Sequence, residues 1–187
     1  MRSPSSEGSA PLPIPPARWH TSCNRSADDA GPRSTGVQAA VIQQCSDVSQ
    51  PGWLALRQQL WPHCAAKEHL AEMSAFLAEP ARFAQFVKYD GSGVAVGLVE
   101  VAIRTDYVNG ADTSPVAFLE GIYVVPRARR SGVARELVAA AERWALGMGC
   151  TELASDAAIE NTSSHAMHAA LGFVETERVV FFRKVPR

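Results

Sequence analysis

The chain has 187 residues, enough for one domain of about 150 residues and a tail. Its 47% of apolar and 20% of charged residues suit an ordinary buried core, and a formal net charge of -1 gives no general reason to expect a nucleic-acid-binding protein. No stretch approaches the roughly 20 apolar residues that a membrane span needs.

Residues 1–36 differ in composition from the rest of the chain. They are rich in Pro, Ser, Gly, Ala and Arg and almost lack large aliphatic residues, so they cannot bury enough apolar surface to offset the entropy cost of ordering. They also contain no apolar run of signal-peptide length. We expect a disordered leader over residues 1–36, or an over-extended translation start, and a cytoplasmic protein with one domain over residues 37–187.

The first half of this domain mixes strands and helices. The elements expected are a strand over 37–45, helices over 53–61 and 68–77, and strands over 83–89 and 94–104. Pro51-Gly52 precedes the first helix and Pro62 ends it. The sequence Asp90-Gly91-Ser92-Gly93 predicts a hairpin turn between the last two strands.

The second half is centred on residues 118–146. The expected elements are a strand over 118–125, a helix over 132–146, a strand over 151–155, a helix over 161–171 and a closing strand over 174–184. This order predicts an α+β fold, with helices interrupting a mixed, mostly antiparallel sheet.

The loop between the strand over 118–125 and its helix is strongly cationic. It carries Arg127, Arg129 and Arg130 and ends at Gly132. The free N–H groups and the dipole of a helix start attract anions, and arginine offers forked donors suited to phosphate. The loop is therefore either an anion site or a solvated basic turn. Neither the Walker pattern nor the dinucleotide glycine pattern is present.

Residues 129–134 resemble the coenzyme A loop of the GNAT superfamily of N-acetyltransferases, which reads Q/R-x-x-G-x-G/A. A second GNAT element, N-x-x-A-x-x-L-Y-x-K-x-G-F, is similar to residues 161–173. The outright matches to it are Asn161, Gly172 and Phe173, Ser164 and Met167 are conservative, and the departures are His168 for tyrosine and Ala170 for lysine.

Several separated segments look like the aminoglycoside 6'-N-acetyltransferases, a GNAT branch that confers resistance. They are QLWPH, DYVNG, SPVAFLEGIYVVP, ELASD and LGFVETERVVFFRK. The resemblance implies the GNAT fold over residues 37–187 and direct transfer of acetyl from acetyl-CoA to the antibiotic's 6'-amino group within a ternary complex. Kanamycin, tobramycin and amikacin are the type of substrate expected.

Three other functions remain open. A pocket lined with acids would also suit a polyamine, a peptide N-terminus or a lysine as acetyl acceptor. A non-catalytic acyl-CoA-binding module would need no pocket for a polycation. Non-specific nucleic-acid binding through the arginine loop would show a steep salt dependence, which we do not expect.

Two acidic residues stand out chemically, because an aminoglycoside is a polycation whose ammonium groups seek carboxylates. Glu120 lies in an apolar strand, where a carboxylate is costly unless it is paired or functional. Asp156 ends another strand. We expect Glu120 and Asp156 to position the amine and accept its proton. His168, in place of the family's thiolate-protonating tyrosine, either donates a proton or is merely packed.

The resemblance also implies binding residues. The antibiotic pocket would comprise Trp61, Tyr107, Glu120, Asp156 and Glu177. The pantetheine arm of the cosubstrate would bond to the backbone of Ile122, Tyr123 and Val124 and to Asn161. The pyrophosphate would be held by N–H groups of Arg130, Ser131, Gly132, Val133, Ala134 and Arg135.

Metal and covalent chemistry are not expected. His63, Cys64 and His69 lie close in sequence, but no second cluster completes a tetrahedral metal site. The four cysteines form no C-x-x-C pair, and Cys150 has no nucleophile context, so we expect no acyl-enzyme. The family often pairs subunits through C-terminal strands, which implies a homodimer; the apolar residues over 179–182 suit that role or the core.

Overall fold

The computed structural model describes residues 40–186, so the expected leader lies outside the described part of the chain. Its elements are the strands β1 (Val41–Gln44), β2 (Phe83–Tyr89), β3 (Ala95–Arg104), β4 (Val116–Val124) and β5 (Leu153–Ser155) and the helices α1 (Trp53–Leu60), α2 (Ala66–Ala78), η1 (Pro126–Ala128), α3 (Val133–Gly147) and α4 (Thr162–Leu171). None of these helices is long and apolar enough to cross a bilayer.

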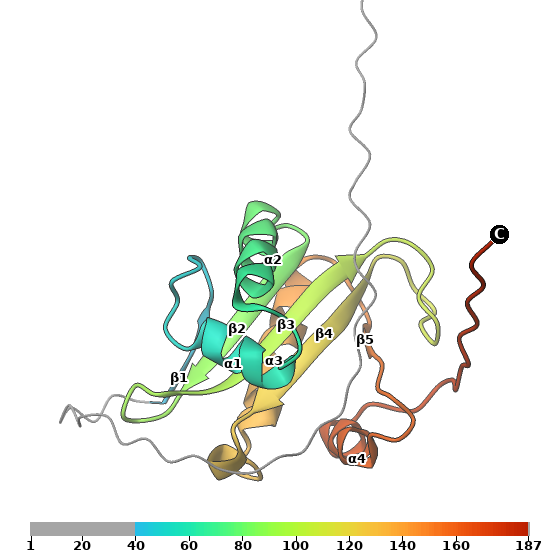
Figure 1. The fold of residues 1–187 in the computed structure, drawn as a ribbon. Helices are drawn as coiled ribbons and strands as arrows, with labels where there is room; N and C mark the ends of the chain where they lie inside the picture. The colour runs from blue at the N-terminus through green and yellow to red at the C-terminus, as the bar shows by residue number, and fades with distance from the viewer. Residues whose placement is uncertain (1–39, 187) are drawn as a thin grey trace, which may run out of the picture.

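The five strands form one sheet in the order β1-β2-β3-β4-β5 (Figure 1). Strands β1 to β4 are antiparallel neighbours, and a short turn joins β2 to β3. Strand β5 runs parallel to β4, because the connection between them crosses over through α3. The predicted mixed, mostly antiparallel sheet is confirmed.

Helices cover both faces of the sheet. Helices α1 and α2 lie on one face, and α3 lies on the other (Figure 1). The helical periodicity of α3 buries Val133, Leu137 and Ala141 against the sheet in one core. Trp53 and Met73 belong to a second core beneath α1 and α2. Strands β2 and β3 are therefore buried along nearly their whole length.

Most predicted bounds hold within a few residues. Helix α2 begins at Ala66, two residues before the expected start, because the Glu68 carboxylate accepts a hydrogen bond from the Ala65 N–H at 3.1 Å and caps the first turn. The short helix η1 was not expected. It starts at Pro126, whose fixed φ suits the first position of a helix.

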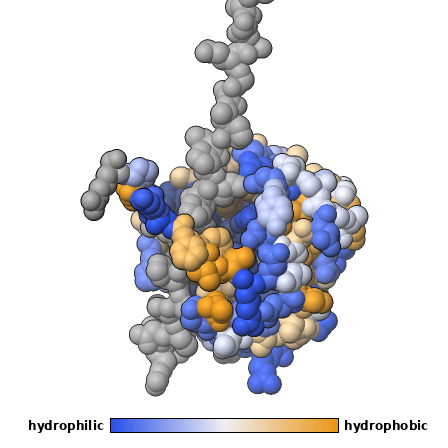
Figure 2. All heavy atoms as spheres, turned by 90° about the vertical axis from the view of Figure 1, so that its right-hand side faces the viewer, coloured by the Kyte–Doolittle hydropathy of each residue, from blue (hydrophilic) through white to orange (hydrophobic). Residues whose placement is uncertain are grey.

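The prediction of a closing strand over 174–184 is wrong. Residues 173–186 form no strand, and the apolar side chains of Val180, Phe181 and Phe182 are 77%, 85% and 94% exposed. Figure 2 shows apolar surface on the side of the molecule to which the C-terminal segment runs. A strand needs a neighbour for its N–H and C=O groups, and within residues 40–186 this segment pairs with none.

Candidate functional site

Strand β5 is the last strand of the sheet and separates from β4 part-way along β4. They pair only from Ala117 to Leu119, opposite Leu153 to Ser155, whereas β4 continues to Val124. From Glu120 onward, the edge of β4 that faces away from β3 has no strand partner among the described residues. Such an edge offers N–H and C=O groups to an extended ligand. The predicted pantetheine residues Ile122, Tyr123 and Val124 lie on it.

Glu120 is the extra residue of a β-bulge. Across β3 and β4, Val101 pairs with Leu119 and Glu100 pairs with Gly121, so Glu120 has no opposite residue. Bulges bend a strand and redirect a side chain, often beside an active site. The bulge therefore places a carboxylate at the point where β4 parts from β5.

The cationic loop has a backbone suited to an anion. Arg130 adopts a left-handed conformation with φ 62°, and Gly132, the N-cap of α3, has φ 90°. A positive φ is uncommon for arginine and costs about 1 to 3 kcal/mol, and such strain is concentrated at functional sites. These turns precede the unpaired N–H groups of the first turn of α3, which together make a concave set of donors.

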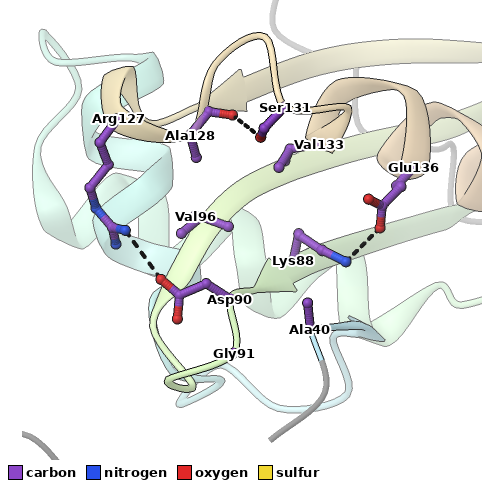
Figure 3. Close-up of a pocket in the computed structure, with 10 residues that line it drawn as sticks. All are labelled: Ala40, Lys88, Asp90, Gly91, Val96, Arg127, Ala128, Ser131, Val133 and Glu136. Atoms are coloured by element: carbon purple, nitrogen blue, oxygen red, sulfur yellow. Dashed lines mark hydrogen bonds and ion pairs between the residues drawn. The ribbon is translucent and has the colours of Figure 1, made fainter. Parts of the chain in front are cut away.

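Two ion pairs brace this loop from its inner side. A hollow of about 320 Å³ separates the loop and α3 from the β2–β3 turn (Figure 3). Across it, Arg127 pairs with Asp90 at 3.1 Å and Lys88 pairs with Glu136 at 2.5 Å. The two ion pairs hold the loop and α3 against the β2–β3 turn. Because each cation is already paired with a carboxylate, we do not assign an anion site to the hollow.

The remaining arginines of the loop and of the start of α3 differ in whether their side chains already have hydrogen-bond partners. Arg129 donates to the Val124 carbonyl at 3.0 Å, and Arg135 donates to the Ala170 carbonyl at 3.0 Å. Within residues 40–186, the Arg130 side chain has no hydrogen bond or ion pair. The hydroxyl of Ser131 donates to the Ala128 carbonyl at 2.7 Å, which leaves its N–H for a ligand.

The positive charge of Arg104 acts on both predicted acids, and the negative charge of Asp156 acts on Glu120. Burial raises the pKa of Glu120, and Arg104 opposes this effect through charge and hydrogen bonds, while the negative charge of Asp156 adds to it. Desolvation likewise raises the pKa of Asp156, and Arg104 and His168 lower it. Carboxyl groups with raised pKa values beside an open strand edge are suited to accept a proton from an amine.

His168 is held between α4 and β5. Its Nδ1 lies 2.8 Å from the Ser164 carbonyl, and its Nε2 lies 3.0 Å from the Ser155 hydroxyl. A carbonyl only accepts, so Nδ1 carries the proton in the neutral ring and Nε2 accepts from Ser155. His168 can therefore supply a proton toward β4 either as imidazolium or through the Ser155 hydroxyl.

Trp61 packs against the strand that carries Glu120. A Cβ added to Gly121 would lie 2.7 Å from Cζ2 of Trp61, so only glycine permits this approach. The Arg57 guanidinium lies 5.1 Å from the centroid of the indole ring. Trp61 is half-buried and lies against Gly121, the residue after Glu120; its role in binding the antibiotic stays a prediction.

Comparison with known proteins gives the family. The sequence model described as Acetyltransferase (GNAT) family matches residues 49–173. An aminoglycoside N(6')-acetyltransferase type 1 of Serratia marcescens is 53% identical over 144 residues, which cover 77% of this chain and 98% of that protein. The chain belongs to the GNAT acetyltransferase family. A protein of the same name from Acinetobacter baumannii is 51% identical over 143 residues, which cover 76% of this chain and 97% of that protein.

Solved structures agree with this GNAT assignment. The crystal structure of the 6'-N-acetyltransferase AAC(6')-Ih from Acinetobacter baumannii has a TM-score of 0.75 and 49% identity, covering 80% of this chain and all (100%) of that one. AAC(6')-Iy in complex with the bisubstrate analogue CoA-S-monomethyl-acetylneamine has a TM-score of 0.75 and 46% identity, with coverage of 80% and 100%. The predicted GNAT fold is confirmed.

Two residues predicted for the GNAT acceptor pocket are exposed on the surface. Tyr107 is 81% exposed on the loop that joins β3 to β4, and Glu177 is exposed in the C-terminal segment. These two stretches meet, because a Cβ on Gly110 would lie 2.2 Å from the Thr176 hydroxyl. Neither Tyr107 nor Glu177 contacts Glu120 or Asp156, so both stay predictions.

Asn161 has a structural role that the sequence had not suggested. It is the N-cap of α4, and its side-chain oxygen accepts from the Ser164 N–H at 3.1 Å and from the Ser163 hydroxyl at 3.0 Å. Its predicted bond to the cosubstrate would therefore come from the amide NH₂ or the backbone.

Sequence reasoning missed two charged clusters near the GNAT site. One is Arg104, the partner of Glu120. The other is buried beneath α1, where Arg57 contacts Glu72 at 2.6 Å and Glu100 at 3.4 Å, and Trp53 donates to Glu100 at 2.8 Å. A carboxylate in the otherwise apolar β3 was the one available signal for the second cluster. No group of three potential metal ligands occurs in the described part of the chain.

Proposed function

We propose that this protein transfers the acetyl group of acetyl-CoA to the 6'-amino group of aminoglycoside antibiotics and so confers resistance. The observation that carries the proposal is its 53% identity across 98% of the aminoglycoside N(6')-acetyltransferase type 1 of Serratia marcescens. The site supports it, since a polycation would find Glu120 and Asp156 beside the open edge of β4.

The reaction needs few groups. Asp156 or Glu120 takes a proton from the ammonium, directly or through water, and the free amine attacks the thioester carbonyl carbon. A C–N bond forms, and a backbone N–H on the open part of β4 stabilises the oxyanion. The nitrogen of the tetrahedral intermediate gives its second proton to the neighbouring carboxylate or to water as the C–S bond breaks. His168 or Ser155 returns a proton to the leaving thiolate, and we expect no acyl-enzyme, because Cys150 is buried in the core at 2% exposure.

Each substrate has its own part of the site. The open edge of β4 would bond to the pantetheine arm, and the first turn of α3 with Arg130 would hold the pyrophosphate. Trp61 would pack against a sugar ring of the antibiotic, and Tyr107 and Glu177 would border the pocket. Antibiotics of kanamycin, tobramycin and amikacin type fit because all carry several ammonium groups.

The test is mass spectrometry of tobramycin incubated with the protein and acetyl-CoA. The proposal expects the gain of one acetyl group, and no gain for an aminoglycoside with a hydroxyl at the 6' position. The double variant Glu120→Gln/Asp156→Asn should bind acetyl-CoA yet fail to modify tobramycin. Acetylation of spermidine in preference to tobramycin would instead identify a polyamine acetyltransferase.

We further propose a cytoplasmic homodimer in which the C-terminal segment of each subunit pairs with the partner. This would give residues 174–185 the strand neighbour that a single chain lacks and cover Phe181 and Phe182, which are 85% and 94% exposed. Sedimentation should give a dimer for the full chain and a monomer after deletion of residues 174–187. A full chain that is monomeric at micromolar concentration would refute the dimer.

A further inference from the structure

Arg104 is the cation closest to the predicted catalytic acids. It is the last residue of β3 and pairs in register with Val116 at the start of β4, and its side chain reaches along β4 to Glu120, where β4 parts from β5. Its guanidinium lies 3.5 Å from the centroid of the Phe118 ring, a stacking arrangement that fixes the guanidinium plane. The side chain of Arg104 is 25% exposed and that of Glu120 is 19% exposed.

The hydrogen bonds of this pair leave one defined vacancy on the carboxylate. Arg104 donates from Nε to Oε1 of Glu120 at 3.1 Å, and from Nη2 to Oε1 and Oε2, each at 2.9 Å. A carboxylate has about four acceptor positions. Three are occupied, so the remaining position is on Oε2. A substrate ammonium can use it without displacing Arg104.

The charges around the two acids place Arg104 between them. Glu120 is influenced by Arg104, Asp156 and Arg82, and Asp156 is influenced by Arg104 and His168. Among the charges acting on each acid, that of Arg104 has the largest effect, and it favours the ionised form of both acids against the effect of burial. Without it, two desolvated carboxylates of like charge would remain, a situation in which ionisation becomes harder.

We propose that Arg104 is a positioning residue of the transfer reaction, which fixes the Glu120 carboxylate so that one acceptor position on Oε2 meets an ammonium of the antibiotic. This inference rests on the proposed function. The charge of Arg104 favours the ionised form of both acids, at the cost of one positive charge in a pocket for polycations. Arg104 therefore lowers affinity for the antibiotic and raises turnover.

This role differs measurably from that of an ordinary salt bridge between strands. Loss of a pair that only held the two strands together would lower stability but leave kcat of the folded enzyme unchanged at high pH, where both acids are ionised. Removing Arg104 raises the pKa values of Glu120 and Asp156 in either case, so kcat at high pH is the readout that separates the two roles. The loss of Arg104 also affects kcat and KM differently. We expect kcat to fall because Glu120 loses its orientation, and KM for the antibiotic not to rise because the pocket becomes more negative.

The experiment measures kcat and KM for tobramycin between about pH 5 and about pH 9, with acetyl-CoA saturating. For Arg104→Met we expect the acid limb of kcat/KM to move up by about one pH unit, which is a roughly tenfold loss on that limb. At high pH, kcat should fall while KM does not rise. Arg104→Lys keeps the charge but not the fork, so its acid limb should stay near wild type while kcat falls.

A matched control lies on the same sheet. Arg82 also stacks on a phenylalanine, 4.9 Å from the Phe83 centroid, and pairs with a glutamate, Glu79, outside the site. The charge of Arg82 lowers the pKa of Glu120 less than Arg104 does, so Arg82→Met should move the acid limb up by clearly less than Arg104→Met. In a Glu120→Gln background, Arg104→Met should cost much less kcat than in wild type, because the residue it positions is gone.

Two results would overturn the inference. One is an unchanged acid limb in the Arg104→Met enzyme, whose normal affinity for acetyl-CoA shows that it is folded. If Arg104→Met does not fold, an unchanged kcat in Arg104→Lys overturns the inference instead. The other is a full loss of kcat from Arg104→Met in the Glu120→Gln background. Failure of the proposed function would look different, because the wild-type enzyme itself would not acetylate tobramycin.

Discussion

Replacing Gly121 by alanine tests whether Trp61 forms a wall of the antibiotic pocket. Gly121 has no need of a left-handed φ, so the strain of the variant comes only from contact. The new Cβ would lie 2.7 Å and 2.8 Å from Cζ2 and Cη2 of Trp61 and 2.9 Å from Cδ2 of Leu60. All three distances are too short for carbon atoms, so the end of α1 must move.

The size of the effect follows from how freely that end can shift. Overpacking a rigid core costs about 1 to 3 kcal/mol, and a half-buried indole at a helix end places the cost near the lower limit, about 1 kcal/mol. The displaced indole no longer meets the sugar ring, which we expect to raise KM for tobramycin about tenfold. KM for acetyl-CoA should stay within about twofold, since the loop before α3 is untouched.

The assay is release of the CoA thiol, followed with a chromogenic disulfide, combined with thermal unfolding. Gly147→Ala is the matched control, because its added Cβ meets no atom within 4 Å. It should leave both KM values and the midpoint of unfolding nearly unchanged. An unchanged KM for tobramycin in Gly121→Ala would refute the role of Trp61, whatever happens to stability.

Three further predictions concern the supporting structure. Arg57→Leu should lower the free energy of unfolding by about 3 to 5 kcal/mol, because it leaves Glu100 buried and unpaired. Burial raises the pKa of Glu100 and the charge of Arg57 lowers it, so removing Arg57 raises this pKa further. The loss of unfolding free energy should be largest at neutral pH, where Glu100 must be buried without its cation, and should shrink on acidification as Glu100 is protonated. Denaturant titrations at several pH values check this. Asn161→Ala should cost about 1 kcal/mol through loss of the α4 cap, whereas Asn161→Asp should retain most of it in thermal melts. Gly132→Val should weaken acetyl-CoA binding at least about tenfold by calorimetry, since a β-branched residue resists φ 90°; equal affinity would argue against a pyrophosphate site.

Periodicity and turn chemistry predicted the fold well. The apolar stripe of α3 and the Asp90–Gly93 turn are local signals, and the structure forms both elements where they were expected. The closing strand failed for a physical reason. The run of β-branched and aromatic residues over 179–182 suits a strand, but it does not provide a neighbour, and in one chain none of the described strands pairs with it.

The site was only partly predictable. Glu120 could be singled out because a carboxylate in an apolar strand is costly, and the motif located the loop at Gly132. Arg104 could not be found, because it is 16 residues from Glu120 and the contact depends on the pairing of β3 with β4. The bulge is likewise a matter of strand register, which a sequence pattern does not determine.

Helix α3 begins at the site and packs one face against the core. Its first turn is the proposed pyrophosphate contact, while Leu137 and Ala141 are fully buried against the sheet. Occupancy by the cosubstrate should therefore protect the whole domain from unfolding, by about 2.7 kcal/mol at a hundredfold excess over Kd. In a cell rich in acetyl-CoA, this added stability would let the antibiotic pocket tolerate destabilising substitutions that change its drug preference. The protein would then stay folded, and escape proteolysis, despite those substitutions.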